Sequence, residues 1–390
     1  MKSVALICFD NPFLKPIEGG KRGMLSRIKA LASLDIELDV YLLNKTIEGM
    51  ADFNKLDLGS NVHFFQYQMN SLSPAFFLSR YPVCCCKRYV SKLVDELEKH
   101  DYDVAFYEGA QVALYRVKNK VKASKHILYY HDIESKYRLQ QAESESNPLK
   151  KMLQRVESNK FERLEKSLPS LFDSHLFVSC DECEKFDELH SLGSRAKYFP
   201  YAVDYIQDEV SKECIPGRIL YVGDLTLSNN YESLLWFVEK VLCSASFKDL
   251  EVELRIIGRI SEEKRSHLTA IDRRVNVLGY VDDLNAEYND AAVMISPILF
   301  GAGVKVKLLD ALGRGQIVVA NKKACEGTRL LEGDNLLIAD DPAEYAVLCK
   351  EVLENRNSYL QVAENGLEFI RKHHSLEAHA ASLLAEIEND

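Results

Sequence analysis

The chain has 390 residues, of which 47% are hydrophobic and 28% charged, and its net charge is -10. This length exceeds one ordinary core and predicts two domains of about 200 residues or slightly less, with the composition of a globular protein. The negative charge argues against a general nucleic-acid binder, because a phosphate backbone would be repelled.

The N-terminus predicts a buried strand and no export signal. The apolar run in Val4–Phe9 stops at Asp10, and no stretch of the chain reaches the roughly 18 apolar residues of a membrane span. The ten cysteines have no framework spacing, and the C-x-x-C at Cys180–Cys183 has no second pair or nearby His pair. We therefore expect reduced thiols, no metal and a cytoplasmic location.

Short apolar, β-branched runs alternate with amphipathic stretches along the first half of the chain. This alternation indicates parallel strands joined by crossover helices. The expected strands are Val4–Phe9, Leu38–Leu43, Val104–Tyr107, His126–Tyr130 and His175–Val178. The expected helices are Met24–Ala32, Arg88–Glu98, Leu149–Leu168 and one that begins at Asp181-Glu182.

A second cycle of the same kind follows the polar stretch Asp204–Gly217. Its strands are expected at Arg218–Val222, Glu253–Ile257, Val275–Leu278, Val293–Ser296 and Ile317–Ala320, with a helix around Tyr231–Leu242 after the first of them. Two such series predict an α/β fold with two doubly wound, Rossmann-like domains that face one another across a cleft. Ligands are expected beyond the carboxyl ends of the strands.

The domain boundary is expected near residue 205, between residues 1–204 and 205–390. The last helical segment, Leu376–Ile387, is expected either to complete the second domain or to pack back on the first. The sequence leaves both arrangements open.

A glycine-rich turn follows the fourth strand of the second cycle. Phe300–Gly303 (FGAG) leads into a helical run at Val304–Leu312, and its small residues let an anion approach the backbone closely. The helix start offers unpaired amides, and Lys305 and Lys307 add charge. Residues two apart point about 200° from each other on a helix, so we prefer Lys307 as the phosphate ligand. The alternative is an ordinary strand-to-helix turn with solvated lysines.

This turn belongs to a longer segment, SPILFGAGVKVKLLDALGRGQIVVANKKACEGTRLL, at residues 296–331. The segment resembles the donor-binding core of the family 4, or group 1, glycosyltransferases of the GT-B fold. Those enzymes commonly show a glycine-containing loop, a helix with an acidic residue, an A-x-G-x-P-V-V-A run and then E-G. Here Ala311–Ala320 and Glu326-Gly327 match that order.

Other segments resemble the same family in the same order along most of the chain. RILYVGDLTLSNNYESLLWFVEKVL resembles the first strand, loop and helix of its C-terminal domain, and LRIIGR and VNVLGYVDDLNAEYNDAAVMISP resemble the strands that follow. EGGKRGMLSRIKALA resembles its glycine loop, YYHDIESKYR its His-containing loop and FPYAVD its linker. The resemblance implies that residues 1–204 form the acceptor-side domain and residues 205–390 the domain that binds a nucleotide sugar.

The resemblance assigns roles in the donor segment. Asp310 matches the acid that binds the ribose hydroxyls in this family, whereas the family's other acid, eight positions earlier, falls on Ala302. The chain therefore resembles a subgroup with a small-residue loop, in which the amides of Gly301–Gly303 are expected to meet the sugar or the phosphates. Glu326 and Gly327 match the E-G near the donor. Glu326 is expected to accept a sugar hydroxyl, or else to be an ordinary acid at a helix start.

The loop after Gly223 departs from the family. Many relatives have an Arg and a Lys there, whereas Asn229 and Asn230 offer only neutral hydrogen bonds. We therefore expect Lys305 and Lys307 to supply the charge that holds the diphosphate.

In the first domain, His131 follows an expected strand and matches the position of the family's active-site histidine. A lone histidine is more often structural, so both roles are considered. Gly19 and Gly20 are expected to let the backbone approach the diphosphate or the acceptor. Arg22 is expected to face an anionic acceptor or solvent, and Glu108 ends a strand at the same edge, with a site role and a structural role equally open.

The resemblance implies a retaining, metal-independent transferase that moves a sugar from a nucleoside diphosphate sugar to a glycan, lipid-linked or similar acceptor in surface polysaccharide or glycoconjugate synthesis. It requires no cofactor. Asp282-Asp283 lacks D-x-D spacing and is interpreted as loop capping. The alternatives are a nucleotide-sugar epimerase or hydrolase of the same fold, and a non-catalytic sugar-nucleotide-binding protein.

The acceptor side has a weaker signal. The segment Ser73–Tyr89 mixes aromatic and basic residues. It indicates either a peripheral contact with the inner face of a membrane or a loop followed by the start of a core helix.

Overall fold

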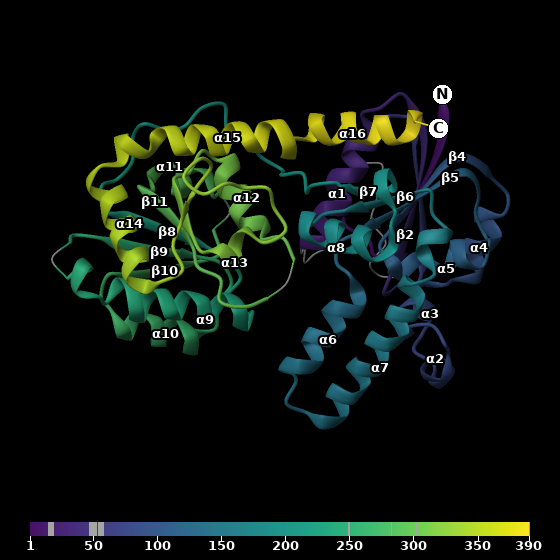
Figure 1. Ribbon diagram of the computed structural model, residues 1–390, viewed down its shortest axis with the longest axis horizontal. Helices are drawn as coiled ribbons and strands as arrows, with labels where there is room; N and C mark the ends of the chain where they lie inside the picture. The colour runs from purple at the N-terminus through teal and green to yellow at the C-terminus, as the bar shows by residue number, and fades with distance from the viewer. Residues whose placement is uncertain are drawn as a thin grey trace. The chain divides into compact units, whose positions relative to one another are not determined.

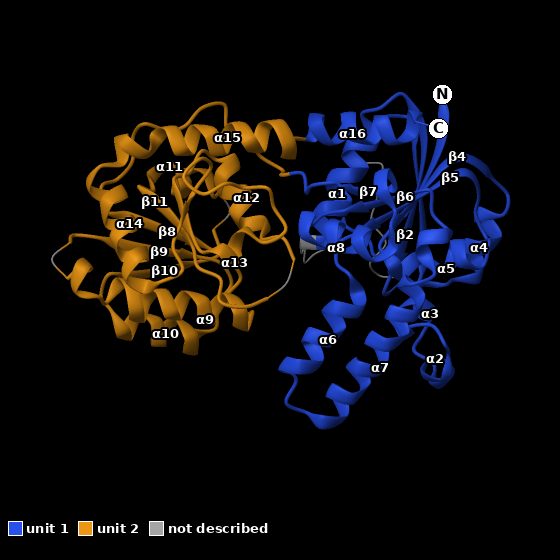
Figure 2. Ribbon diagram, viewed as in Figure 1, with its two compact units in different colours: residues 1–202, 376–390 blue, residues 203–375 orange. Residues whose placement is uncertain are grey.

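A computed structural model of the protein describes residues 1–14, 19–46, 53, 58–248, 250–281, 283–301 and 303–389. The chain divides into two compact units, residues 1–202 with 376–390 (unit 1) and residues 203–375 (unit 2) (Figure 2). Each unit contains a parallel sheet with helices, so the predicted α/β fold with two doubly wound domains is confirmed. The cleft between the domains stays a prediction.

Unit 1 is built on a seven-stranded parallel sheet with the order β3-β2-β1-β4-β5-β6-β7 (Figure 1). The strands are β1 (Lys2–Ile7), β2 (Ile36–Asn44), β3 (Val62–Gln68), β4 (Asp101–Glu108), β5 (Lys122–Tyr130), β6 (Ser174–Phe177) and β7 (Ala196–Tyr198). The inner strands bury their carboxyl-terminal halves, which are mostly apolar, as expected for a parallel sheet covered on both faces. The register pairs Ile7 with Tyr107 and Glu108 with Tyr129, which aligns the carboxyl ends of β1, β4 and β5.

Helices connect these strands, and α16 packs against α1, which also contacts β2. The α-helices of unit 1 are α1 (Gly19–Ala32), α2 (Pro74–Leu78), α3 (Val83–Arg88), α4 (Ser91–Leu97), α5 (Leu114–Val117), α6 (Glu134–Ser144), α7 (Pro148–Glu165), α8 (Cys180–His190) and α16 (Leu376–Glu388). Short 3₁₀ turns lie at Ala110–Val112, Leu168–Ser170 and Gly193–Arg195. Helices α6 and α7 pack as a hairpin that extends away from the sheet of this unit (Figure 1).

Local sequence explains where several helices begin. Helix α7 begins at Pro148 because the Asn147 side chain accepts hydrogen bonds from the amides of Leu149 and Lys150, and proline suits the first helical position. In α8, the Ser179 hydroxyl caps the amide of Glu182, three residues on.

Unit 2 is built on a six-stranded parallel sheet with the order β10-β9-β8-β11-β12-β13. The strands are β8 (Arg218–Val222), β9 (Glu253–Ile257), β10 (Val275–Gly279), β11 (Val293–Ser296), β12 (Val318–Ala320) and β13 (Leu337–Ile338). Both sheets have a topological switch point. The strands that directly follow β1 and β8 are added along the sheet in one direction. The strands β4 and β11 then pair with the opposite edges of β1 and β8, so the strand order reverses there.

Figure 1 shows α15 along one side of the unit 2 sheet and α9 and α10 along the other. The α-helices are α9 (Ser228–Phe237), α10 (Glu262–Ile271), α11 (Asn285–Asp290), α12 (Val306–Gly313), α13 (Lys322–Cys325), α14 (Pro342–Glu354) and α15 (Leu360–His374). Helix α9 continues into a π-helical turn at Val238–Leu242, and 3₁₀ turns lie at Ala245–Phe247 and Arg356–Tyr359.

The structure differs from the expected elements in several ways. The helix expected at Arg88–Glu98 is divided between α3, which ends at Arg88, and α4 (Ser91–Leu97). Strands β3, β7 and β13 were not expected, and all three lie at or next to a sheet edge. Gly19 and Gly20 were expected in a loop, but they form the first turn of α1. The helix expected from Val304 begins instead at Val306, so Lys305 precedes it. Within the described part of the chain, no helix is long and apolar enough to cross a membrane.

Candidate functional site

The loop between β11 and α12 is held in a conformation that requires glycine. Gly301 has φ of 112° and Gly303 has φ of 76°, a region that residues with side chains rarely adopt. A Cβ at Gly301 would also lie 3.1 Å from Nδ2 of Asn229, at the start of α9. The backbone of this loop therefore lies close to the α9 start, beyond the carboxyl ends of the neighbouring strands β8 and β11. Ala302, predicted to contact the sugar, lies outside the described residues.

Lys307 points from the first turn of α12 toward β8 and α9. Its ammonium donates hydrogen bonds to the Tyr221 hydroxyl and to Oδ1 of Asn230, each at 3.1 Å, and lies 4.6 Å from the centroid of the Tyr221 ring. Burial, and then repulsion from Lys305, lower the pKa of Lys307 to about 7. The residue as a whole is partly buried.

Lys305 is buried beside the same loop. Its ammonium donates to the carbonyls of Gly301 at 3.3 Å and Gly303 at 2.5 Å. Of the two lysines that the sequence predicted as phosphate ligands, Lys305 ends the loop and Lys307 lies in the first turn of the helix after it, so both are at the switch point of the unit 2 sheet.

The asparagines after β8 lie beside these lysines. Asn230 accepts from Lys307 and donates from Nδ2 to the carbonyl of Asp224 at 2.9 Å, which fixes the loop that begins at Gly223. The Tyr221 hydroxyl donates to the Asn230 carbonyl at 3.2 Å. Sequence reasoning missed Tyr221, because an aromatic residue inside a strand reads as core.

The remaining predicted donor residues are less closely grouped. Asp310 lies one turn after Lys307 on α12, partly exposed. Glu326 is exposed and forms an ion pair with Lys323 at 2.7 Å, and Gly327 follows it with φ of 79°. The predicted roles of these three residues stay predictions.

Unit 1 has a second polar cluster, at the carboxyl ends of β1, β4 and β5. Glu108, the last residue of β4, is 0% exposed, and Arg27 of α1 is 1% exposed. Arg27 donates from Nη2 to Oε2 of Glu108 at 3.0 Å and from Nε to the other oxygen. His131 donates from Nε2 to Oε2 of Glu108 at 2.8 Å. Glu108 therefore lies behind His131, with both oxygens hydrogen-bonded.

The charges in this cluster follow from its burial. Burial would raise the pKa of Glu108, but Arg27 and His131 outweigh it and hold that pKa at about 2. Burial lowers the pKa of His131, and the nearby Glu108 offsets this only in part. At neutral pH the cluster contains an ionised Glu108, a charged Arg27 and a neutral imidazole at His131.

Aromatic rings surround the cluster. The Arg27 guanidinium lies 3.4 Å from the centroid of the Tyr129 ring, and the rings of Phe9 and Tyr129 meet the His131 ring edge to face. Sequence reasoning missed Arg27, since an arginine within an amphipathic helix carries no signal of its own.

The other predicted residues of unit 1 lie on the first turns of α1. Gly19 and Gly20 begin this helix, and Arg22 follows them, partly buried. Lys21 donates to the carbonyl of Leu14 at 3.0 Å. The backbone of these glycines is thus a helix start, so any contact with an anion would come from helix amides.

No group of three or more His, Cys, Asp or Glu side chains in the described part of the chain is arranged to hold a metal ion. Of the acidic pair at residues 282 and 283, Asp282 lies outside the described residues. The Asp283 side chain accepts from the amide of Asn285, just after it.

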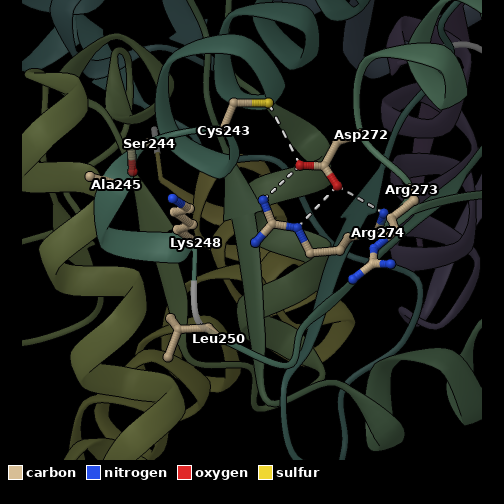
Figure 3. Close-up of a pocket in the computed structure, with 8 residues that line it drawn as sticks. All are labelled: Cys243, Ser244, Ala245, Lys248, Leu250, Asp272, Arg273 and Arg274. Carbon is tan, nitrogen blue, oxygen red and sulfur yellow. Dashed lines mark hydrogen bonds and ion pairs between the residues drawn. The ribbon is translucent and has the colours of Figure 1, made fainter.

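A pocket of about 330 Å³ lies at the opposite edge of the unit 2 sheet (Figure 3). Two of its charged side chains, Arg274 and Asp272, are used within the fold. Arg274 binds Asp272 and donates to the carbonyls of Phe247 at 2.5 Å and Leu242 at 2.7 Å. Because Arg274 immediately precedes β10, the pocket lies at the amino ends of the strands, away from the lysine cluster.

Comparisons with known proteins relate the chain to glycosyltransferases. Residues 216–355 match the family model described as group 1 glycosyl transferases. An uncharacterised 44.6 kDa protein in the cps region of Klebsiella pneumoniae is 27% identical over 397 residues, which cover 99% of this chain and 100% of that protein.

Two solved structures have the same fold over their full lengths. Sucrose-phosphate synthase from Thermosynechococcus elongatus is 15% identical, with a TM-score of 0.72 over 99% of this chain and 98% of the other. Anabaena HepE in complex with UDP and glucose is 13% identical, with a TM-score of 0.66 over 99% of each chain. Residues 216–355 therefore match the group 1 glycosyl transferase family model, and the chain as a whole has the fold of these two solved structures.

Proposed function

We propose that this protein moves a sugar from a nucleoside diphosphate sugar to a glycan or lipid-linked acceptor, with retention of anomeric configuration and without a metal. The observation that carries the proposal is the pair of lysines at the switch point of unit 2. Lys307 is held by two neutral oxygens, from Tyr221 and Asn230, beside a glycine loop whose backbone a ligand can approach.

This arrangement suits a diphosphate leaving group. Transfer of the sugar leaves negative charge on the diphosphate, and fixed cations and amides at that position stabilise the transition state. Loss of one such donor typically costs about 2.7–4 kcal/mol. In this scheme Lys307 and Lys305 supply the charge, Asp310 binds the ribose, and the leaving phosphate accepts the acceptor's proton on the same face of the sugar.

The relatives support the proposed pathway and donor. One relative is a protein in the cps region of Klebsiella pneumoniae, and the HepE structure contains UDP and glucose. We therefore propose a role in surface polysaccharide or glycoconjugate synthesis, and UDP-sugars are the first donors to test.

A thermal-shift panel of nucleoside diphosphates and sugar nucleotides tests donor binding. A ligand at 100 times its Kd should stabilise the protein by about 2.7 kcal/mol. Lys307→Met and Asp310→Ala should reduce this shift, and Lys322→Met, a change of an exposed lysine in the same unit, should not. An unchanged shift in both site variants would place the donor elsewhere.

Product analysis separates the candidate activities. Incubation with donor alone should give neither an epimer nor rapid release of free sugar, either of which would favour the epimerase or hydrolase alternative. With a competent acceptor, NMR of the product should show the anomeric configuration of the donor. Donor binding without transfer to any member of a glycan and lipid-linked acceptor library would favour the non-catalytic alternative.

Exposed apolar side chains in unit 1 support a peripheral membrane contact. In the predicted segment, α2 has no buried residue, and Leu78 is 90% exposed, whereas α3 buries Cys85 in the core. Helix α7 lies beside α2, since Lys160 donates to the carbonyl of Phe77 at 3.1 Å. A further set of exposed apolar residues lies on one face of α7, at Leu149, Met152, Leu153 and Val156.

Basic residues at Lys150, Lys151 and Arg155 accompany this apolar face of α7, a combination that suits an anionic lipid surface. Flotation with anionic liposomes should recover the wild-type protein, and Leu149→Glu with Leu153→Glu should weaken recovery. Equal recovery of both, or of neither, would refute the contact. The cytoplasmic location stays a prediction.

A further inference from the structure

The buried cluster of unit 1 contains two charged residues, Glu108 and Arg27, that have no direct part in the proposed transfer reaction. Glu108 is fully buried, and its two oxygens are occupied by Arg27 and His131. Such a carboxylate cannot contact a substrate. It can, however, control the ring that does.

We propose that Glu108 and Arg27 are positioning residues, which hold His131 in the tautomer with its proton on Nε2 and so present Nδ1 as an acceptor for a substrate hydroxyl. This inference rests on the proposed function, because it assigns the way in which His131 meets the sugar or acceptor.

The tautomer follows from hydrogen-bond chemistry. An ionised carboxylate can only accept, so the proton in the 2.8 Å contact between Glu108 and His131 belongs to Nε2. A neutral imidazole carries one proton, and Nδ1 is then an acceptor. Within the described part of the chain, no hydrogen bond to Nδ1 of His131 is formed. The His131 side chain is 14% exposed, so the ring is not completely enclosed.

Arg27 makes this arrangement stable. A carboxylate with no access to water would tend to take up a proton, and a protonated Glu108 could donate to the ring and reverse the tautomer. The guanidinium contacts both carboxylate oxygens and is itself stacked on Tyr129, so the carboxylate stays ionised and its orientation is fixed. Nε2 of the nearby His379 lies 3.4 Å from Nη1 of Arg27.

The same geometry predicts what Glu108→Gln does. Arg27 has only donors, so it should bind the amide oxygen of the new side chain. The amide NH₂ group then faces Nε2 of His131 and can only donate. The imidazole proton should therefore move to Nδ1, which turns the substrate-facing nitrogen from an acceptor into a donor.

NMR of ¹⁵N-histidine-labelled full-length protein at pH 7.5 tests this directly, with His131→Gln to assign the signals. Wild type should show His131 protonated on Nε2 only, and Glu108→Gln should show the opposite tautomer. If wild-type His131 carries its proton on Nδ1, or is doubly protonated, the inference is wrong whatever the activity. The wild-type measurement does not depend on the stability of Glu108→Gln.

Kinetics separate positioning from folding. Glu108→Gln should lower kcat/KM for transfer about 10- to 100-fold, by analogy with the hydrogen-bond partners that orient metal-binding histidines. Its UDP affinity should stay at the wild-type value, because the nucleotide is assigned to unit 2. Unchanged kcat/KM in a variant with the reversed tautomer would overturn the positioning role. A wild-type protein with the expected tautomer but no transferase activity would instead refute the proposed function alone.

Discussion

The charge state of Lys307 predicts an unusual pH dependence of nucleotide binding. In the free protein, burial and the neighbouring Lys305 lower the pKa of Lys307 to about 7, so its ammonium is about half protonated at pH 7. A diphosphate interacts best with the charged form, and binding should therefore draw a proton onto Lys307 above pH 7.

The magnitude follows from the protonated fraction. With a pKa of about 7, that fraction falls from roughly a quarter at pH 7.5 to roughly 3% at pH 8.5, and the apparent Kd rises by the inverse ratio. We therefore expect the affinity for UDP to weaken about eightfold across this unit of pH, or about 1.2 kcal/mol. The phosphate itself contributes little, because its second ionisation, near pH 6, is already complete.

Isothermal titration of UDP at pH 8 in buffers of different ionisation enthalpy measures the proton directly. Wild type should take up about 0.9 proton per UDP bound, because only about a tenth of Lys307 is protonated in the free protein at pH 8. Lys307→Met should bind more weakly with uptake near zero, and Lys322→Met should behave as wild type. A wild-type affinity that is flat from pH 7.5 to 8.5, or uptake that persists in Lys307→Met, would refute this account of the site.

Further predictions concern stability and metal. The pKa of Lys307 is lower in the folded protein than in the unfolded chain, so the free energy of unfolding of unit 2 should rise by about 2 kcal/mol between pH 7 and 9. Urea titrations of Lys307→Met should show no such rise. A rise that persists in this variant would mean that another group causes it. Gly301→Ala forces a side chain onto a positive φ beside Asn229 and should cost about 1–3 kcal/mol in the same assay, a prediction contradicted by an unchanged midpoint. Glu386→Ala removes the acceptor of Ser174 and Lys197 and should lower the free energy of unfolding of unit 1 by about 1–2 kcal/mol. A variant as stable as wild type would show that these two interactions are dispensable. Transferase activity should survive excess EDTA, and restoration of lost activity by Mg²⁺ or Mn²⁺ would disprove metal independence.

The strands that the sequence predicted best are central ones. β8, β9 and β11 were predicted with their observed bounds. β8 and β11 are apolar runs over most of their length, as expected for strands buried on both faces, whereas β9 (ELRII) alternates before its apolar end. β3 is partly exposed, with the mixed sequence VHFFQYQ, and β13 has only two residues, so neither shows a clear period.

The candidate sites likewise include residues that the sequence predicted and residues that it did not. Lys305 and Lys307 were predictable because glycines, a strand end and charges follow one another within a few residues. The Arg27–Glu108–His131 cluster joins residues 81 and 23 positions apart, and only the alignment of β1, β4 and β5 brings them together. The start of α1 was misread because two glycines more often indicate a loop than the first turn of a helix.

The return of α16 to unit 1 has a consequence during synthesis. The face of α1 that packs against α16 is made early, but its partner, Leu376–Glu388, leaves the ribosome only after all of unit 2. At about 5–20 residues per second, synthesis of the 173 residues of unit 2 alone keeps this face of α1 uncovered for roughly 9 to 35 seconds after residue 202 has been made. Unit 1 should therefore depend on chaperones more strongly than unit 2, whose residues 203–375 are continuous in the chain.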